Sequence, residues 1–173
     1  AKNEPNLTYH DNEWGVPEHN DQKLFEFLIL EGAQAGLSWT TILNRRNGYR
    51  DAFSNFDVLV ISKYTKNHIE KLVQNKEIIR NKLKINSVIN NAKKFIEIQK
   101  QFGSFDEYVW SFVNHKTIQN KFKKYSDLPS HTDISETLSC DLKKHGFTFV
   151  GPTICYAFMQ AVGMVNDHTV DCF

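Results

Sequence analysis

The chain has 173 residues, of which 40% are hydrophobic and 13% aromatic, and this composition suits one domain with a sizeable core and excludes general disorder. Its net charge of +1 gives no global reason to expect a nucleic-acid partner. Three cysteines without dense spacing argue against a secreted disulfide scaffold, and no signal peptide or membrane-length apolar run is present, so we expect a cytoplasmic protein with no membrane partner.

The first half of the chain carries start and stop signals at helical spacing. NDQKLFEFLILEG predicts a helix that Asn20 or Asp21 can cap and Gly32 can end. TKNHIEKLVQNKEIIRNKLKINSVINNAKKFIEIQ predicts two helices, the first capped by Thr65, with an interruption near residues 74–77. A helix-hairpin-helix is possible at this interruption.

The second half continues the same pattern. SFDEYVWSFV opens with a capping box at Ser104, and SETLSCDLKKHG predicts a helix from a capping Ser135 to a stop at Gly146. GPTICYAFMQAVG places Pro152 in a first helical turn and Gly163 at the far end. Strand candidates are few, so we expect an all-α protein in which residues 1–173 form a single domain.

Positive charge is concentrated between residues 76 and 100. This stretch has seven basic residues against Glu77 and Glu97, a net charge of +5. The pattern indicates either an anionic partner or a solvated helix face. The basic residues are Lys76, Arg80, Lys82, Lys84, Lys93, Lys94 and Lys100.

Glu31 is the first candidate for chemistry. It stands seven residues after Leu24 and four after Phe27, so its carboxylate points from the apolar face of the first predicted helix, whereas Glu26 falls on the opposite side. Burying a carboxylate without a partner costs several kcal/mol, so Glu31 either meets donors, lines a pocket or turns out to solvent at the helix end. GAQAGLSW follows at once, and its glycines and Trp39 allow close backbone approach and stacking, which favours the pocket.

The two ends of the chain hold candidate metal ligands. VNDHTVDCF puts His168 and Cys172 one helical turn apart, and LTYHDNEWGVPE supplies His10 as a third ligand if the termini meet. The alternative is a buried histidine and an unrelated cysteine at a helix end. No fourth ligand is evident from the pattern.

Several long motifs carry a family resemblance. YHDNEWGVPE, LEGAQAGLSW, WSFVNH and FVGPTICYAFMQAVGMVNDH with its following Cys resemble the bacterial DNA-3-methyladenine glycosylase I family, in order and spacing, over essentially the whole chain. The resemblance implies an all-α, single-domain helix-hairpin-helix DNA glycosylase fold with its termini joined by a zinc site. It also implies a monomeric bacterial base-excision repair enzyme that flips 3-methyladenine out of alkylated double-stranded DNA, hydrolyses it off and releases the free base without strand cleavage.

The resemblance assigns roles to individual residues. Glu31 becomes the catalytic and base-binding carboxylate, with Tyr9 and Trp39 as further base-binding residues. Structural Zn²⁺ is expected on His10, His168 and Cys172, with a fourth ligand from a Cys upstream of Ala1. From the turn and the charge pattern themselves, the expected DNA contacts are Leu37 as a wedge after Gly36, and Arg80, Lys82 and Lys84 on the backbone.

Two positions depart from the family pattern. Asn6 stands where an aromatic residue often precedes the Tyr9 position, and Glu77 stands where a glycine often precedes an Ile-Ile pair. Two other functions fit part of the sequence: a non-enzymatic DNA-binding module would need only the basic stretch, and a small-molecule hydrolase would need only the buried carboxylate.

Overall fold

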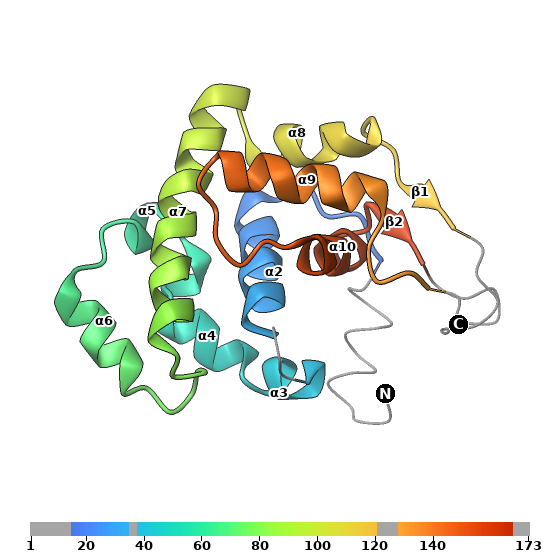
Figure 1. Cartoon of the computed structure of the whole chain (residues 1–173). Coiled ribbons are helices and arrows are strands. Elements are labelled where there is room, and N and C mark those ends of the chain that lie inside the picture. Colours follow the sequence, from blue (N-terminus) through green and yellow to red (C-terminus); the bar gives the residue numbers. More distant parts are fainter. Residues whose placement is uncertain (1–14, 35–37, 121–127, 168–173) are drawn as a thin grey trace.

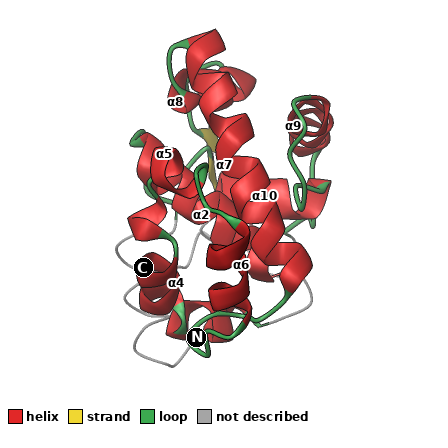
Figure 2. Cartoon of the chain, turned by 90° about the vertical axis from the view of Figure 1, so that its left-hand side faces the viewer, coloured by secondary structure: helices red, strands yellow, loops and turns green. Residues whose placement is uncertain are grey.

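The computed structural model describes residues 15–34, 38–120 and 128–167. Most of these residues are helical, as predicted, and helix dominates the view in Figure 2, with strand confined to two pairs of residues in the described ranges. Among them, no helix combines the length and apolar character needed to cross a bilayer. The helices are α2 (Asp21–Gln34), α3 (Trp39–Asn44), α4 (Arg46–Ala52), η1 (Ser54–Phe56), α5 (Val58–Ile61), α6 (Lys66–Val73), α7 (Lys82–Phe102), α8 (Phe105–Trp110), η2 (Ser111–Val113), α9 (Asp133–Lys144) and α10 (Pro152–Ala161).

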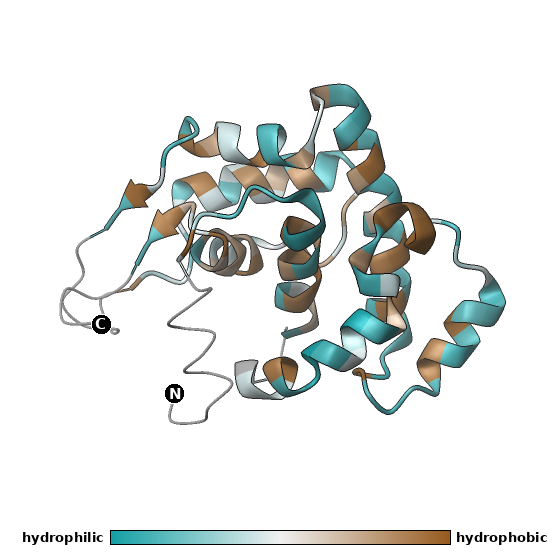
Figure 3. Ribbon diagram, turned by 180° about the vertical axis from the view of Figure 1, so that it is seen from behind, coloured by the Kyte–Doolittle hydropathy of each residue, from teal (hydrophilic) through white to brown (hydrophobic). Residues whose placement is uncertain are grey.

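Helix α2 lies at the centre of the molecule and contacts α7, α8 and α10 (Figure 1). Its residues 24–33 are all buried, so the helix is covered on every side. Outer helices are amphipathic instead, and α6 alternates between hydrophilic and hydrophobic residues at the right-hand edge of Figure 3. A carboxylate between residues 24 and 33 of α2 is therefore buried whichever way it points.

Several predicted helix starts are confirmed by their side-chain caps. The Asn20 side chain accepts a hydrogen bond from the Lys23 N–H at 3.1 Å at the start of α2. Thr65 and His68 form a reciprocal capping box on α6, and the Ser104 hydroxyl accepts from the Glu107 N–H at 3.0 Å on α8. These signals act within one turn of the chain, so the sequence predicts them well.

Two predicted helix boundaries are wrong. Gly32 does not end α2, which continues to Gln34; a Cβ atom at Gly32 would lie 3.4 Å from the Phe149 carbonyl oxygen, an ordinary van der Waals distance, so Gly32 is a packed residue within the helix. Ser135 does not cap α9, because Thr132 is the N-cap and Ser135 is the third helical residue of its capping box.

A two-stranded parallel ladder joins β1 (Ile118–Gln119) to β2 (Val165–Asn166), and the sequence did not predict it. The buried Asp167 carboxylate follows β2 and accepts hydrogen bonds from Asn120 at 2.6 Å, from Gln160 at 3.0 Å and from the Tyr156 hydroxyl. These bonds fix the end of the described chain against α10 and β1.

Asp21 joins the start of α2 to the start of α8. Its carboxylate accepts hydrogen bonds from the backbone N–H groups of Phe105 at 3.0 Å and Asp106 at 2.8 Å. It also accepts from the Gln99 side chain at 3.0 Å. A carboxylate at a helix N-terminus satisfies unpaired N–H groups and is favoured by the helix dipole.

Candidate functional site

Two carboxylates on α2 are buried to a similar degree, with Glu26 6% and Glu31 5% exposed. Glu26 faces α4, where it accepts hydrogen bonds from Arg46 at 2.7 Å and from Arg50 at 2.6 and 3.1 Å. Burial raises the pKa of Glu26, but the hydrogen bonds and charges of Arg50 and Arg46 outweigh it, so this pKa lies below its usual value. Glu26 is therefore an ionised, structural carboxylate.

Glu31 has the opposite electrostatic environment. No residue that the structure describes donates a hydrogen bond or forms an ion pair with its carboxyl group, and burial raises the pKa of Glu31 to about 8. A desolvated carboxyl group with no donor among its described neighbours is costly, and such groups cluster at functional sites. The group can accept a hydrogen bond from a ligand and become ionised beside a ligand cation. The predicted burial of Glu31 is confirmed.

The segment after Glu31 leads directly into α3. Trp39 is the first residue of α3, behind an N-cap at Ser38 whose hydroxyl accepts from the Thr41 N–H at 3.1 Å. Because α3 contacts α2, the structure brings the start of α3 near the last turn of the Glu31 helix. The Trp39 side chain and the whole of Tyr9 lie outside the described residues, as does Asn6.

The predicted DNA wedge, Leu37 after Gly36, also lies outside the described residues. Its flanks are described: α2 ends at Gln34 and the chain resumes at Ser38, just before α3. The three-residue segment 35–37 stands between these two helices in the sequence. It is therefore adjacent in sequence to both Glu31 and Trp39.

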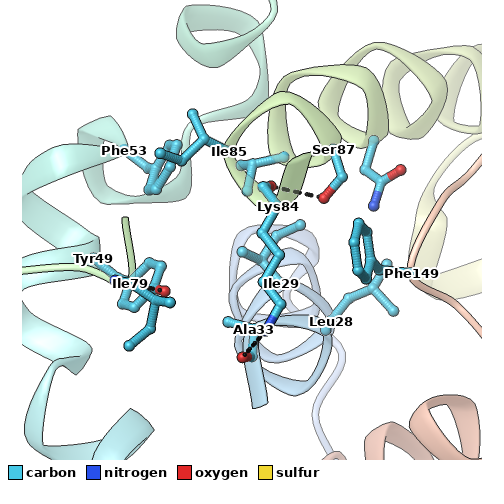
Figure 4. Close-up of a pocket in the computed structure, with 13 residues that line it drawn as sticks. Leu28, Ile29, Ala33, Tyr49, Phe53, Ile79, Lys84, Ile85, Ser87 and Phe149 are labelled. Carbon is cyan, nitrogen blue, oxygen red and sulfur yellow. Dashed lines mark hydrogen bonds between the residues drawn. The ribbon is translucent and has the colours of Figure 1, made fainter. Parts of the chain in front are cut away.

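A pocket between α2, α4 and α7 does not contain Glu31 (Figure 4). Its lining is mostly apolar and includes Ile29 and Ala33 on α2. Leu28 and Gly32 line it as well, so the pocket extends over a broad part of the α2 surface beside Glu31. The Glu31 carboxylate itself is not among the lining groups.

Lys84 crosses this pocket. Its Nζ atom donates a hydrogen bond to the Ala33 carbonyl oxygen at 3.0 Å, as Figure 4 shows, and burial lowers the pKa of Lys84. The prediction of Lys84 as a DNA-backbone contact is not favoured by this arrangement, because the amine is directed into the protein. Arg80 and Lys82 are exposed, as a backbone contact requires.

Helix α7 spreads most of the basic residues of the 76–100 stretch along its length. At 21 residues it is about 30 Å long, so Lys100 lies far from Lys82. Lys94 packs beside Gly146 and lies 3.7 Å from the Glu97 carboxylate. At 100° per residue, Lys82, Lys93 and Lys100 share one side of α7, whereas Lys84 and Lys94 are turned away from it.

The predicted zinc ligands His10, His168 and Cys172 lie outside the described residues. Within residues 15–34, 38–120 and 128–167, no three His, Cys, Asp or Glu side chains are placed to hold a metal ion. The described ends of the chain do meet: the Glu18 N–H donates to the Val162 carbonyl at 2.9 Å. A side chain on Gly163 would lie 2.5 Å from the Pro17 nitrogen, so glycine is needed for this contact.

Comparison with known sequences gives a family match over the whole chain. The family described as methyladenine glycosylase matches residues 1–173. The DNA-3-methyladenine glycosylase of Haemophilus influenzae is 48% identical over 166 residues, which cover 96% of this chain and 90% of that protein. DNA-3-methyladenine glycosylase 1 of Escherichia coli is also 48% identical, over 96% of this chain and 89% of its own length.

Solved structures have the same fold. A crystal structure of 3-methyladenine DNA glycosylase I superposes with a TM-score of 0.98 at 45% identity, covering 100% of this chain and 95% of that one. The enzyme from Staphylococcus aureus, solved to explain its recognition of 3-methyladenine, superposes with a TM-score of 0.97 at 35% identity, covering 99% of this chain and 92% of that one.

Proposed function

The chain belongs to the methyladenine glycosylase family, and from this premise we propose how it removes 3-methyladenine from alkylated DNA. It is a DNA N-glycosylase that acts in base-excision repair by hydrolysing the bond between the damaged base and deoxyribose. The observation that carries the mechanism is the buried Glu31 carboxyl group, which has no partner among the described residues.

Glu31 recognises the charge of the damaged base. Methylation at N3 gives the adenine ring of the nucleotide a positive charge, so the base leaves more readily than a neutral purine and needs less help from an acid. Glu31 accepts a hydrogen bond from the exocyclic amine, and the nearby cation lowers its pKa and favours the ionised form. Neutral adenine offers no such charge, so the site discriminates against it.

Aromatic side chains complete the base pocket in this proposal. Tyr9 and Trp39 stack on the ring and add cation–π attraction. The base leaves the duplex to reach them, and a damaged base costs less to extrude than a paired one. Leu37, after Gly36, fills the gap left in the stack. The proposal is supported by the position of residues 35–37 directly between the Glu31 helix and α3.

The reaction ends at base removal without strand cleavage. Strand cleavage by a glycosylase of this kind would need an amine that attacks the sugar. Lys84 has a lowered pKa, but its amine donates to the Ala33 carbonyl and lines a pocket that does not include Glu31. This position supports water, rather than Lys84, as the nucleophile.

A structural zinc ion joins the chain ends in this proposal. His10, His168 and Cys172 are nitrogen and sulfur ligands that suit Zn²⁺, and an upstream Cys completes a closed tetrahedral site. Support comes from the described segments that lead to them, because Glu18 bonds to Val162 and Pro17 packs on Gly163. Such a site stabilises the fold and has no open position for activating water.

Release of the base from methylated duplex DNA tests the function. Wild-type protein should release 3-methyladenine, identified by chromatography and mass spectrometry, and leave the strand intact. Glu31→Gln should bind the same duplex with wild-type affinity but release the base far more slowly. Absence of 3-methyladenine from the wild-type reaction would contradict the proposed function, whereas an active Glu31→Gln protein would remove only Glu31 from the mechanism.

A further inference from the structure

Phe149 has a backbone conformation that is rare for a bulky residue. Its φ angle is 56°, in the left-handed region, where the side chain of an L-residue crowds its own backbone. The residue lies between α9 and α10, in the FVGPT segment of the sequence, which neither the base pocket nor the zinc site explains. Such a conformation persists only where the surrounding structure holds it, and it occurs often at functional sites.

Buried side chains hold the backbone on both sides of Phe149. Asn91 on α7 is 3% exposed, and its side-chain amide accepts a hydrogen bond from the Thr148 N–H at 2.9 Å and donates one to the Thr148 carbonyl at 2.9 Å. After Phe149, the Val150 carbonyl accepts from the buried hydroxyl of Ser139 on α9 at 2.6 Å. The turn at residues 148–150 therefore cannot relax without leaving buried polar groups unpaired.

The 148–150 turn packs against the part of α2 that carries Glu31. A Cβ atom at Gly32 would lie 3.4 Å from the Phe149 carbonyl oxygen and 3.6 Å from the Phe149 Cβ atom, so the two residues pack in ordinary contact. Phe149 also lines the pocket of Figure 4, as does Leu28 on α2. Leu28 precedes Glu31 by three residues and Gly32 follows it directly, so Phe149 lies beside the turn of α2 that holds the carboxylate.

The position of the Glu31 carboxyl group depends strongly on its helix. Arg46 and Arg50 fix the direction of the Glu26 carboxylate, but within the described part of the chain no donor does so for Glu31. A hydrogen bond to the base needs two heavy atoms about 2.6–3.2 Å apart. A displacement of about 1 Å can slow a reaction by about 100-fold, so firm packing of this turn of α2 matters for excision.

We propose that Phe149 is a positioning residue for Glu31: its left-handed turn, held by Asn91, fixes the end of α2 so that the carboxylate meets the flipped base. The inference rests on the proposed function, in which Glu31 binds the base. In this role Phe149 acts through α2 and does not itself contact the base. Asn91 acts one step further away, because it holds the turn and not the helix.

The test compares Phe149→Gly with Phe149→Leu in single-turnover excision of 3-methyladenine from methylated duplex DNA. Glycine has no side chain and adopts many backbone conformations, so the turn is free to relax and its packing on α2 is lost. Phe149→Gly should slow excision by about 10–100-fold. It should also weaken binding of free 3-methyladenine, measured by calorimetry, by up to about tenfold, the loss of one hydrogen bond. Phe149→Leu keeps an apolar side chain and should retain most of the rate and the base affinity.

Affinity for an undamaged duplex should stay at the wild-type value in both variants, because the proposed role concerns the base site. Asn91→Ala is a second variant, which removes both bonds to Thr148 and leaves Phe149 and Glu31 in place. It should slow excision in the same direction as Phe149→Gly. Rates are compared per folded protein, well below the melting temperature of each variant.

Phe56→Gly is the matched control. Phe56 is also a phenylalanine with a left-handed backbone, with a φ angle of 61°. It packs on α2 at Phe25, with ring centroids 6.4 Å apart, but Phe25 precedes Glu31 by six residues. Because Phe56 is buried, this control should lose stability, while its folded fraction should excise the base at the wild-type rate.

Two results would overturn the positioning role. One is a wild-type excision rate and base affinity in folded Phe149→Gly or Asn91→Ala, even with a lower melting temperature, since that pattern belongs to a purely structural contact. The other is an equal loss of rate in Phe56→Gly. Failure of wild-type protein to release 3-methyladenine is a separate result, which would overturn the proposed function itself.

Discussion

The Lys84 amine and the Ala33 carbonyl oxygen, 3.0 Å apart, join α7 to the last turn of α2. Carbonyl groups in the last turn of a helix have no partner within the helix, and a cation there is favoured by the helix dipole. This bond lies two residues beyond Glu31 and just before residues 35–37. Lys84 therefore holds the part of α2 from which the proposed base site extends.

Lys84→Met should lower the free energy of unfolding by about 1–2 kcal/mol, because it keeps the aliphatic stem and removes the hydrogen bond. Denaturant unfolding measures the effect. Lys82→Met is the control, since Lys82 is exposed only two residues away, and it should leave stability nearly unchanged. The salt dependence of DNA binding should not change in Lys84→Met; a reduced slope would restore Lys84 as a backbone contact.

Glu31 should make stability fall as pH rises. The pKa of this carboxyl group is about 8 in the folded protein and 4.5 ordinarily, so the folded state binds more protons than the unfolded state between these values. The stability contributed by the protonated Glu31 carboxyl group is thus fully present below pH 4.5 and is lost as pH rises towards 8. Relative to wild type, Glu31→Gln should become progressively more stable over this window in denaturant titrations. A pH-independent difference would mean that Glu31 titrates normally.

Glu26 should show the opposite pH dependence. Glu26→Gln leaves Arg46 and Arg50 without their buried carboxylate, which should cost about 3–5 kcal/mol at pH 7. Because the pKa of Glu26 is lowered, its contribution is present above pH 4.5 and should shrink as pH falls through the folded-state pKa. Glu97→Gln removes an exposed ion pair with Lys94 and should cost at most about 1 kcal/mol. Equal costs for the two substitutions would contradict the structural role of Glu26.

Gly48→Ala should destabilise the contact between α4 and the 74–81 connection. The new side chain would lie 2.5 Å from the Glu77 carbonyl oxygen and 2.7 Å from the Glu77 Cβ atom, and overpacking of this kind costs about 1–3 kcal/mol. Glu77→Gly removes the second of these atoms and relaxes the backbone. The double variant should therefore recover part of the lost stability in thermal unfolding; simple addition of the two effects would show that these residues do not share a contact.

Substitution of a proposed zinc ligand should release the metal and lower the stability of the protein together. In protein with its full natural N-terminus, purified without chelators, elemental analysis should find one zinc per chain, and Cys172→Ser should release it and lower the melting temperature. Cys140→Ser is the control, because Cys140 is an exposed cysteine on α9. This variant should retain the metal. The stability losses caused by His10→Ala and His168→Ala should not be additive, since either substitution breaks the same site. Zinc well below one equivalent in wild-type protein would refute the site.

Local signals in the sequence predicted local structure. Thr65 and Ser104 cap helices through groups within three residues, so their roles can be read from the sequence. Gly32 was predicted to end α2, but it lies inside the helix and packs in ordinary contact with Phe149, more than a hundred residues away. A single glycine is tolerated within a helix, so it does not by itself mark a helix end.

Helical periodicity in the sequence was enough to predict which side chains of α2 face the core. The spacing of Glu31 from Leu24 and Phe27 predicted its burial. The burial of Glu26 depends on Arg46 and Arg50 covering the other side of α2, which no spacing within α2 reveals. The net charge of residues 76–100 likewise includes Lys84 with its neighbours, although the fold directs the Lys84 amine into the protein.

The contacts of Asp21 at the start of α2 can form only after a long segment of the chain has been synthesised. Its carboxylate bonds to N–H groups that follow it by 84 and 85 residues. At synthesis rates of about 5–20 residues per second, these partners are made roughly 4–17 s after Asp21 itself. The Asn20 cap of α2 can form as soon as its first turn is made, but the contact between α2 and α8 cannot form until more than half of the chain has been synthesised.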